Sequence, residues 1–292
     1  MKQTIKHLAA LLTVAVLISA AVINAAAEAV FTENGYSYTY INNTTVSLCG
    51  WDNRSPAFSV PDKLAGRSVV EVGSRALMDN KVITSLSFEN ANSLKYIGMF
   101  AFKGCENLSG TVTVPPSVEL IQTAAFEDCT SINSAVINEG IEELPGQCFS
   151  GCTSLQQVTL PQSLKTIGAY AFRNCSSLEY LEIPAGVTSI AASSFRNDAN
   201  LTLGVWYGTQ GYTYAKEKNI PYILLDEVLI GDVNRDDAVS IGDVTSIQRY
   251  LVDSEQLDEL QLKAADVTRD GVVDMDDATK IQKYLARCFD TL

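Results

Sequence analysis

The sequence has 292 residues, which is enough for one or two domains with real cores. It is acidic, with 21 Lys and Arg against 34 Asp and Glu, and a surface of that sign repels the phosphates of nucleic acids. Its one histidine, His7, lies in a segment that we expect to be removed, which excludes Ser-His-Asp or Cys-His catalysis and a His-ligated zinc site in the rest of the chain.

Residues 1–27 predict a signal peptide. Lys2 and Lys6 precede an apolar run over residues 8–23, and small residues follow at 25–27 as in a cleavage site. A short membrane anchor is the alternative, but no stop-transfer pattern follows, and no later stretch is apolar enough to span a bilayer. We therefore expect a secreted, soluble chain whose net charge after cleavage is −15, from 19 basic and 34 acidic residues.

A motif recurs through the middle of the chain. Most copies begin with Phe, carry Cys three residues later and end on an apolar residue three further on, as in FKGCENL and FSGCTSL. The Phe copies lie 23 or 24 residues apart, after a weaker copy, LMDNKVI. The copies start at Leu77, Phe102, Phe126, Phe149, Phe172 and Phe195. Their sixth following residues are Ile83, Leu108, Ile132, Leu155, Leu178 and Leu201.

Each copy continues into a short alternating segment, such as VTLP or LEIP, which predicts a strand. A unit of one short strand and one tight turn or helical piece cannot bury its apolar edge alone, so the units should stack as a solenoid. The pattern A-F-x-x-C-x-x-L-x-x-(V/L)-x-(I/L)-P resembles the BspA-like, or Treponema-type, leucine-rich repeat over about residues 36–225. The resemblance implies a bacterial secreted or surface protein that acts as an adhesin or interaction scaffold.

We expect the leucine-rich repeat domain to span residues 28–226, with an N-terminal cap over 28–75 and repeats over 76–225. An aromatic cluster in the cap would either pack its open apolar end or stack on sugars, and packing is favoured. The cluster comprises Tyr36, Tyr38, Tyr40, Trp51 and Phe58.

Seven cysteines in a chain predicted to be secreted raise the question of disulfides. Four occupy the same repeat position, where the last copy has Asp198. We favour a ladder of buried free thiols, because free Cys packs as a small hydrophobe, although adjacent thiols could come close enough to bridge. These four are Cys105, Cys129, Cys152 and Cys175.

The strand positions between the buried ones should face outward as a polar strip with one aromatic side chain. Such a strip would hold a protein or a glycan, or would be a plain solvated face. The candidate ligand-face residues are Thr111, Thr113, Gln157, Thr159, Tyr180 and Glu182.

Residues 227–292 contain two acidic loops that begin 34 residues apart, each followed by D-x-T-x-I-Q-(R/K)-Y-L. Oxygen-bearing side chains stand at positions 1, 3, 5, 9 and 12 of each loop, with a backbone carbonyl offered at 7, which is the spacing of the twelve-residue EF-hand loop for calcium. Both loops end in Asp instead of Glu, and Asp237 stands where Gly usually makes the turn, a backbone conformation that Asp tolerates. Two loops in tandem predict two calcium ions. The predicted ligands are Asp232, Asn234, Asp236, Ala238, Ser240 and Asp243 in the first loop, and Asp266, Thr268, Asp270, Val272, Asp274 and Asp277 in the second.

No helix is expected before the first loop, since IPYILLDEVLIG reads as a strand and connector. A tandem loop-helix without an entering helix resembles the type I dockerin of cellulosomal proteins over roughly residues 228–289. The resemblance implies that calcium orders the loops and helices, and that one helix face docks onto a cohesin domain of a scaffoldin. It maps the contact positions to Ile241, Gly242, Gln248, Arg249 and Asp253, and in the second copy to Met275, Asp276, Gln282, Lys283 and Arg287.

These features predict an α+β chain, a repeat solenoid followed by a small all-α, calcium-binding dockerin over residues 227–292. The expected function is that of a non-catalytic, secreted cellulosome component, held at a bacterial cell surface through the complex, whose repeats bind a protein or glycan. The alternatives are a carbohydrate-active enzyme carried by the dockerin, or an adhesin tethered by it. The absence of histidine after residue 7 and of an evident carboxylate pair weighs against the enzyme.

Overall fold

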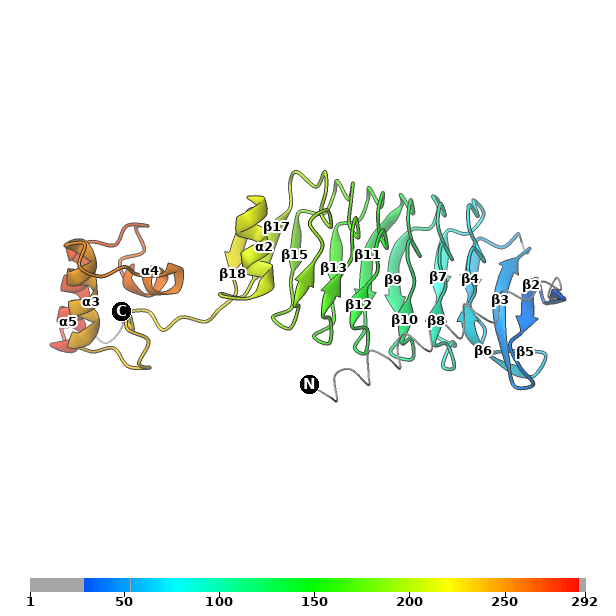
Figure 1. The fold of residues 1–292 in the computed structure, drawn as a ribbon, viewed down its shortest axis with the longest axis horizontal. Coiled ribbons are helices and arrows are strands. Elements are labelled where there is room, and N and C mark those ends of the chain that lie inside the picture. The colour runs from blue at the N-terminus through cyan, green and yellow to red at the C-terminus, as the bar shows by residue number, and fades with distance from the viewer. Residues whose placement is uncertain (1–28, 53, 289–292) are drawn as a thin grey trace. The chain divides into compact units, whose positions relative to one another are not determined.

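The structure, a computed structural model, describes residues 29–52 and 54–288 (Figure 1). The predicted signal peptide lies outside the described residues. Contacts divide the described chain into two compact units. The first contains the residues up to Glu179 together with Ser189–Asn200, and the second contains Tyr180–Thr188 and the chain from Leu201 onward. No helix in the described part of the chain is long and apolar enough to cross a membrane.

The first unit begins with a sheet that closes the N-terminal end of the repeats. Its strands lie in the order β1-β2-β3-β6-β8-β10, and β5 pairs with β6. The aromatic cluster packs within this cap, as expected: the rings of Tyr36 and Trp51 are 4.5 Å apart, and those of Trp51 and Phe58 are 5.3 Å apart. The strands of this sheet are β1 Phe31–Glu33, β2 Tyr36–Tyr40, β3 Thr45–Trp51, β5 Lys63–Leu64, β6 Arg67–Val72, β8 Tyr96–Ile97 and β10 Leu120–Ile121. Strand β4 Ala57–Ser59 lies outside it.

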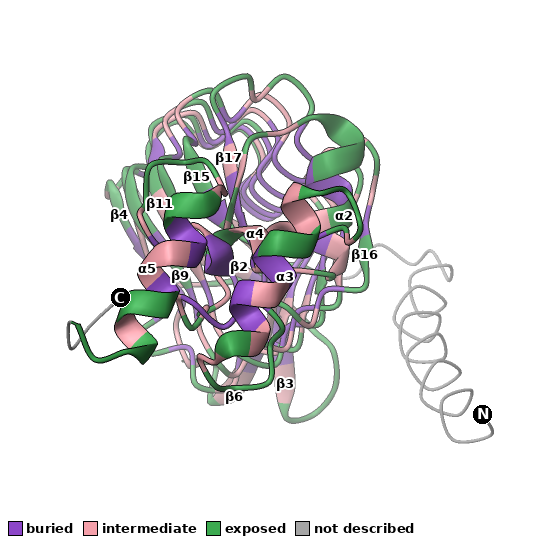
Figure 2. Cartoon of the chain, turned by 90° about the vertical axis from the view of Figure 1, so that its left-hand side faces the viewer, coloured by how far each residue is buried: buried purple, intermediate pink, exposed green. Residues whose placement is uncertain are grey.

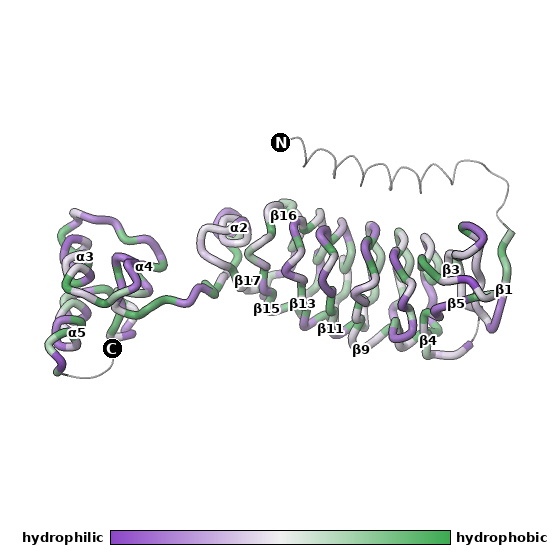
Figure 3. Tube along the Cα trace, turned by 90° about the horizontal axis from the view of Figure 1, so that it is seen from below, coloured by the Kyte–Doolittle hydropathy of each residue, from purple (hydrophilic) through white to green (hydrophobic). Residues whose placement is uncertain are grey.

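Each following repeat contributes two strands. The longer strands run parallel: β4 pairs with β7, and β9, β11 and β13 form a three-stranded sheet. These strands are β7 Ser85–Ser87, β9 Gly110–Val114, β11 Ile132–Ile137 and β13 Gln157–Thr159. Two-residue strands, which the sequence analysis did not include, pair along a second face. They are β8 Tyr96–Ile97, β10 Leu120–Ile121, β12 Glu143–Leu144, β14 Thr166–Ile167 and β16 Ser189–Ile190. Figure 3 shows both hydrophobic and hydrophilic stretches along the turns of the repeats.

A column of phenylalanine rings forms the centre of the repeats. Consecutive rings from Phe102 to Phe195 are 5.1 to 5.9 Å apart and lie within 12° of parallel. The predicted apolar residue of each copy, from Ile83 to Leu201, is also buried. Each ring therefore stacks on the ring of the next repeat, which is the stacking that the constant spacing of the motif predicts.

The four repeat-position cysteines are buried free thiols, as favoured from the sequence. Each Sγ donates a hydrogen bond to a backbone carbonyl of the preceding repeat: Cys105 to Leu77, Cys129 to Phe102, Cys152 to Phe126 and Cys175 to Phe149, at 3.1 to 3.2 Å. These hydrogen bonds satisfy a polar atom inside an apolar interior, so the thiols have a packing role.

The described residues of the second unit form a sheet and four helices. Strands β15 Tyr180–Glu182, β17 Thr202–Val205 and β18 Tyr222–Leu224 form a parallel sheet, and helix α2 Gln210–Lys218 connects β17 to β18. The remaining helices are α3 Ile241–Leu251, α4 Glu259–Ala265 and α5 Met275–Leu285. As expected, no helix lies between residue 225 and the first acidic loop.

Helices α3 and α5 pack around a small apolar core. Val244 and Ile247 of α3 meet Ala278 and Ile281 of α5 there, and Leu257 closes the same core. Each helix thus has a buried side and an exposed side (Figure 2). The two predicted loops directly precede these two helices, and Val233 and Val267, at the second position of each loop, are buried in the same core.

Candidate functional site

The first acidic loop is closed by its last residue. Asp243 has no exposed surface, and its Oδ1 accepts hydrogen bonds from the backbone N–H groups of Val233 (2.7 Å) and Asn234 (3.0 Å). Its Oδ2 accepts from the N–H of Ser240 at 2.7 Å. Asp232, at the other end of the loop, accepts from the N–H groups of Asp236 and Asp237. The two carboxylates therefore tie the two ends of the loop together.

The second loop repeats this arrangement. Asp277 is fully buried and accepts from the N–H groups of Thr268 and Asp274, each at 2.9 Å. Asp266 accepts from Asp270 at 3.2 Å and from Gly271 at 3.0 Å. Four hydrogen bonds to the loop carboxylates recur at the same positions of the two loops, which shows that the sequence repeat is also a structural repeat. The loops differ at position 2, where Val233 donates to Asp243 but Val267 donates to the carbonyl of Ala265.

The turn position of each loop has the expected left-handed backbone. Asp237 has φ 65°, and Gly271, at the same position of the second loop, has φ 86°. Asp at this position is thus accommodated, as its tolerance for this conformation predicted. Arg235 and Arg269, at position 4, are also left-handed, with φ 58° and 64°.

The donor set of these loops fits a hard divalent cation. All side-chain groups at the predicted positions offer oxygen, from Asp, Asn, Thr or Ser, which are the ligands that calcium prefers. Asp232, Asp243 and Asp277 are buried, and in the described residues no ion pair neutralises them. A buried carboxylate without a compensating charge raises the free energy of the folded state, so a bound cation would stabilise the loops. The loop carboxylates contact backbone amides, and in the described chain no three His, Cys, Asp or Glu side chains converge on one metal position.

Ser240 and Asp274 have a second role that the sequence analysis missed. Each is the N-cap of the following helix: Ser240 accepts from the N–H of Gly242, and Asp274 accepts from that of Asp276. Asp243 and Asp277 complete capping boxes by accepting from the cap residues' own N–H groups. The signal was available, since a Ser or Asp followed three residues later by an acidic residue before an apolar run marks a helix start.

The residues mapped as partner contacts lie on the outside of α3, α5 and their ends. Ile241 and Met275 are 64% and 51% exposed, an unusual exposure for large apolar side chains at matching positions of the two copies. Gly242 is half-buried. The other mapped residues are exposed: Gln248, Arg249, Asp253, Asp276, Gln282, Lys283 and Arg287.

The predicted ligand face of the first unit is formed by neighbouring strands. Thr111 and Thr113 of β9 lie opposite Ser134 and Val136 of β11, which in turn face Gln157 and Thr159 of β13. The four predicted residues in these rows are exposed. Tyr180 and Glu182, in the second unit, are exposed as well.

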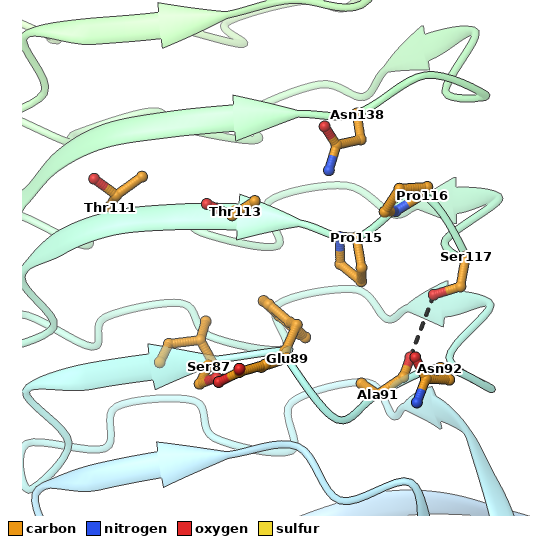
Figure 4. Close-up of a pocket in the computed structure, with 12 residues that line it drawn as sticks. Ser87, Glu89, Ala91, Asn92, Thr111, Thr113, Pro115, Pro116, Ser117 and Asn138 are labelled. Carbon is orange, nitrogen blue, oxygen red and sulfur yellow. Dashed lines mark hydrogen bonds between the residues drawn. The ribbon is translucent and has the colours of Figure 1, made fainter.

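A hollow of about 590 Å³ opens beside Thr111 and Thr113 (Figure 4). Asn138 lies at its edge, where its Nδ2 donates to the carbonyl of Val114 at 2.8 Å, and Ser117 donates to the carbonyl of Ala91 at 3.3 Å. Apolar side chains such as Leu86 and Phe88, hydroxyl, amide and proline groups, and one carboxylate, Glu89, line the hollow. It offers hydrogen-bonding groups but no pair of converging carboxylates.

Two family models match the chain. The BspA type leucine rich repeat region matches residues 70–202 in six copies, and the dockerin type I domain matches residues 230–286. No curated protein matches.

Solved structures that match this chain include bacterial leucine-rich repeat proteins. A leucine rich cell surface protein from Faecalibacterium prausnitzii is 25% identical, with a TM-score of 0.46, and the match covers 61% of this chain and 54% of that one. This chain therefore spans about half the length of that protein. The leucine-rich repeat protein of T. pallidum is 23% identical over 77% of this chain and 96% of its own, with a TM-score of 0.52, which supports the repeat fold alone. The chain thus joins a BspA-type leucine-rich repeat region to a type I dockerin domain, two non-catalytic domain types.

Proposed function

We propose that this chain is a non-catalytic, secreted component of a cellulosome-type complex. In this proposal the dockerin, residues 227–292, binds two calcium ions and docks onto a cohesin domain of a scaffoldin, which places the chain at a bacterial cell surface. The repeat domain, residues 28–226, presents its strand face to a protein or glycan. Residues 1–27 direct export and are removed, which the N-terminal sequence of the secreted chain would test.

One observation carries the docking part of the proposal: the two loops share four hydrogen bonds to carboxylates at matching positions, and each ends on a fully buried aspartate that no cation in the described chain neutralises. Bound calcium would supply the missing positive charge. The residues that would hold it are the twelve loop positions predicted above. The chain's own part is to fix the loop ends through Asp243 and Asp277, so that helices α3 and α5 begin at fixed points.

The cohesin-facing surface would then consist of the exposed residues of α3 and α5. Ile241 and Met275 supply exposed apolar side chains at matching positions, and Arg249, Lys283 and Arg287 supply cations on an acidic domain. Apolar groups provide contact energy, whereas rim charges chiefly steer association and select the partner.

The test is binding of the full chain to a purified type I cohesin, measured by calorimetry in calcium and in chelator. We expect binding in calcium and none in chelator, and two ions bound per chain. Asp232→Ala with Asp266→Ala should abolish binding without unfolding the repeats. Glu217→Ala, an exposed carboxylate outside the loops, is the matched control and should bind normally. Binding by the double variant in chelator would refute the proposal.

A further inference from the structure

The outer face of the sheet formed by β15, β17 and β18 carries an exposed tyrosine. Tyr180 is 43% exposed, although it lies in a strand that is paired along β17. An aromatic ring exposed on a sheet surface offers a flat apolar face and a polar edge to a ligand. No hydrogen bond to the Tyr180 hydroxyl exists among the described residues, so this polar group is also available to a ligand.

The ring of Tyr180 lies across the neighbouring strand. Its register partner on β17 is Thr202, but its hydroxyl end reaches over Gly204, two residues further along. A Cβ atom at position 204 would be 2.2 Å from the Tyr180 Oη and 2.9 Å from its Cζ. Glycine at this position is therefore what allows the ring to lie along the sheet surface. One side of the ring packs against backbone, and the opposite side is left open.

Two side chains flank this ring. Glu182 and Ile223 are the register partners of Gly204 on its two sides, on β15 and β18. Ile223 is 54% exposed, and Glu182 is exposed as well. A flat aromatic surface, an aliphatic side chain and a carboxylate acceptor thus lie in one small area. Burial, with the Glu182 charge second, raises the pKa of the Tyr180 hydroxyl, so that it stays protonated and can donate.

We propose that Tyr180, lying over Gly204 between Glu182 and Ile223, is a stacking platform for a neutral polysaccharide. This inference rests on the proposed function of the repeat domain as a binding surface, and it names the ligand class. A pyranose ring has an apolar C–H face that can pack on Tyr180, while its edge hydroxyls can donate to Glu182 and accept from the Tyr180 hydroxyl.

Charge and area favour a neutral saccharide over other ligands. The platform's one charged group is a carboxylate, on a chain with net charge −13, so a uronate or sulfated glycan would be repelled. A protein partner usually needs a larger apolar centre ringed by polar residues than one ring and one Ile223 side chain provide. A single sugar unit matches the size of this patch.

The test is calorimetry of the full chain in calcium with cellohexaose, xylohexaose, mannohexaose and a polygalacturonate hexamer. We expect at least one neutral oligosaccharide to bind and the acidic one not to bind. Tyr180→Ala should weaken binding by about tenfold, the scale of one lost aromatic contact. Gly204→Ala keeps the tyrosine, but its new Cβ displaces the ring, and it should give a similar loss. Tyr170→Ala, a partly exposed tyrosine in the first unit whose ring faces Arg173 at 5.6 Å, should bind like the wild type.

Three results would overturn the inference. The first is no binding of any neutral oligosaccharide by a preparation that still binds cohesin in calcium, which would leave the proposed docking function intact. The second is equal binding by Tyr180→Ala and the wild type. The third is that the chain binds a secreted protein through Tyr180 and binds no saccharide, which would make the patch a contact for a protein. Thermal unfolding of each variant checks that lost binding is not lost fold.

Discussion

The carboxylate of Asp243 accepts a hydrogen bond from the backbone amide of Val233, ten residues earlier, at 2.7 Å. The same carboxylate also accepts from Asn234 and from the backbone and hydroxyl of Ser240. One buried side chain thus fixes the start of the loop, its end and the first turn of α3. A metal ligand in this position would also hold the loop and helix together, so loss of the side chain should affect the stability of the fold as well as calcium binding.

Asp243→Ala should therefore destabilise the dockerin even in chelator. Removing the acceptor leaves buried N–H groups without partners, at a cost of about 2 kcal/mol or more. The measurement is urea unfolding of the full chain followed by far-ultraviolet circular dichroism, with and without calcium. Asp276→Ala, an exposed acidic residue in the first turn of α5, is the control and should change stability little. Equal stability of Asp243→Ala and wild type in chelator would show that the tie is unimportant.

Four buried thiols, three of them in the ladder, should resist alkylation in the folded chain. Burial raises the pKa of the Cys129, Cys148, Cys152 and Cys175 thiols, and only the thiolate reacts. Brief treatment with iodoacetamide at pH 8, followed by peptide mass spectrometry, should modify exposed Cys288 and leave these four unmodified. The same treatment in urea should modify them all. Rapid modification of Cys152 without denaturant would contradict the packing described here.

Asp198 should make the repeats less stable as the pH rises. It occupies the position where the earlier repeats have a buried cysteine. Its Oδ1 accepts from the N–H of Cys175 at 2.8 Å, and its Oδ2 is buried without a partner in the described chain. Burial raises the pKa of this carboxyl from 3.8 to about 7. The folded chain thus holds a proton that the unfolded chain releases, so the stabilisation is complete below pH 3.8 and is lost as the pH rises through about 7.

Urea unfolding at pH 5 and at pH 8 tests this dependence. The wild type should lose stability over that range relative to Asp198→Asn, whose side chain is neutral at both values. Asp198→Cys restores the thiol of the earlier repeats and should also remove the difference. Parallel pH profiles for the wild type and Asp198→Asn would show that the carboxyl does not titrate in this window.

Two glycines with left-handed backbones differ in the space beside them, and this difference gives another prediction. Gly151 has φ 78°, and a Cβ there would be 2.3 Å from the Oδ1 of Asp128 in the preceding repeat. Gly110 has nearly the same φ, 80°, with nothing within 4 Å of the added atom. Both substitutions to Ala cost about 1 kcal/mol of backbone strain, but Gly151→Ala adds a clash.

Gly151→Ala should thus lower the free energy of unfolding more than Gly110→Ala, as measured by thermal unfolding. This difference between the two glycine variants should shrink when Asp128→Ala is added, because the clashing side chain is then gone. If both glycine variants lose the same stability, the Asp128 side chain has room to move and the predicted clash does not occur.

The residues that recur at a fixed spacing in the sequence are buried in the structure, as predicted. Phe102 to Phe195 and the apolar residue that follows each of them are inside, because a fixed spacing along the chain becomes a column in space. The acidic loops were found in the same way, from oxygen-bearing residues at fixed offsets. The left-handed turn at Asp237 followed from the loop pattern as well.

Other features depend on neighbours that no local pattern encodes. The two-residue strands, such as Thr166–Ile167, are too short to show a period of two, and they exist only because adjacent repeats pair with them. Phe100, Gln147 and Tyr170 adopt left-handed backbones that their side chains do not favour, so the turn of the solenoid imposes them. The position of Tyr180 over Gly204 likewise needs the register of two strands.

The even stacking of the phenylalanine column has an evolutionary consequence. Since Phe126 and Phe149 occupy equivalent places, excision of residues 126–148 would put Phe149 directly after the repeat of Phe102, with the period of the chain intact. Such a chain should fold one turn shorter. Gain or loss of whole units thus offers this lineage a way to change the reach of its binding surface without redesigning the interior.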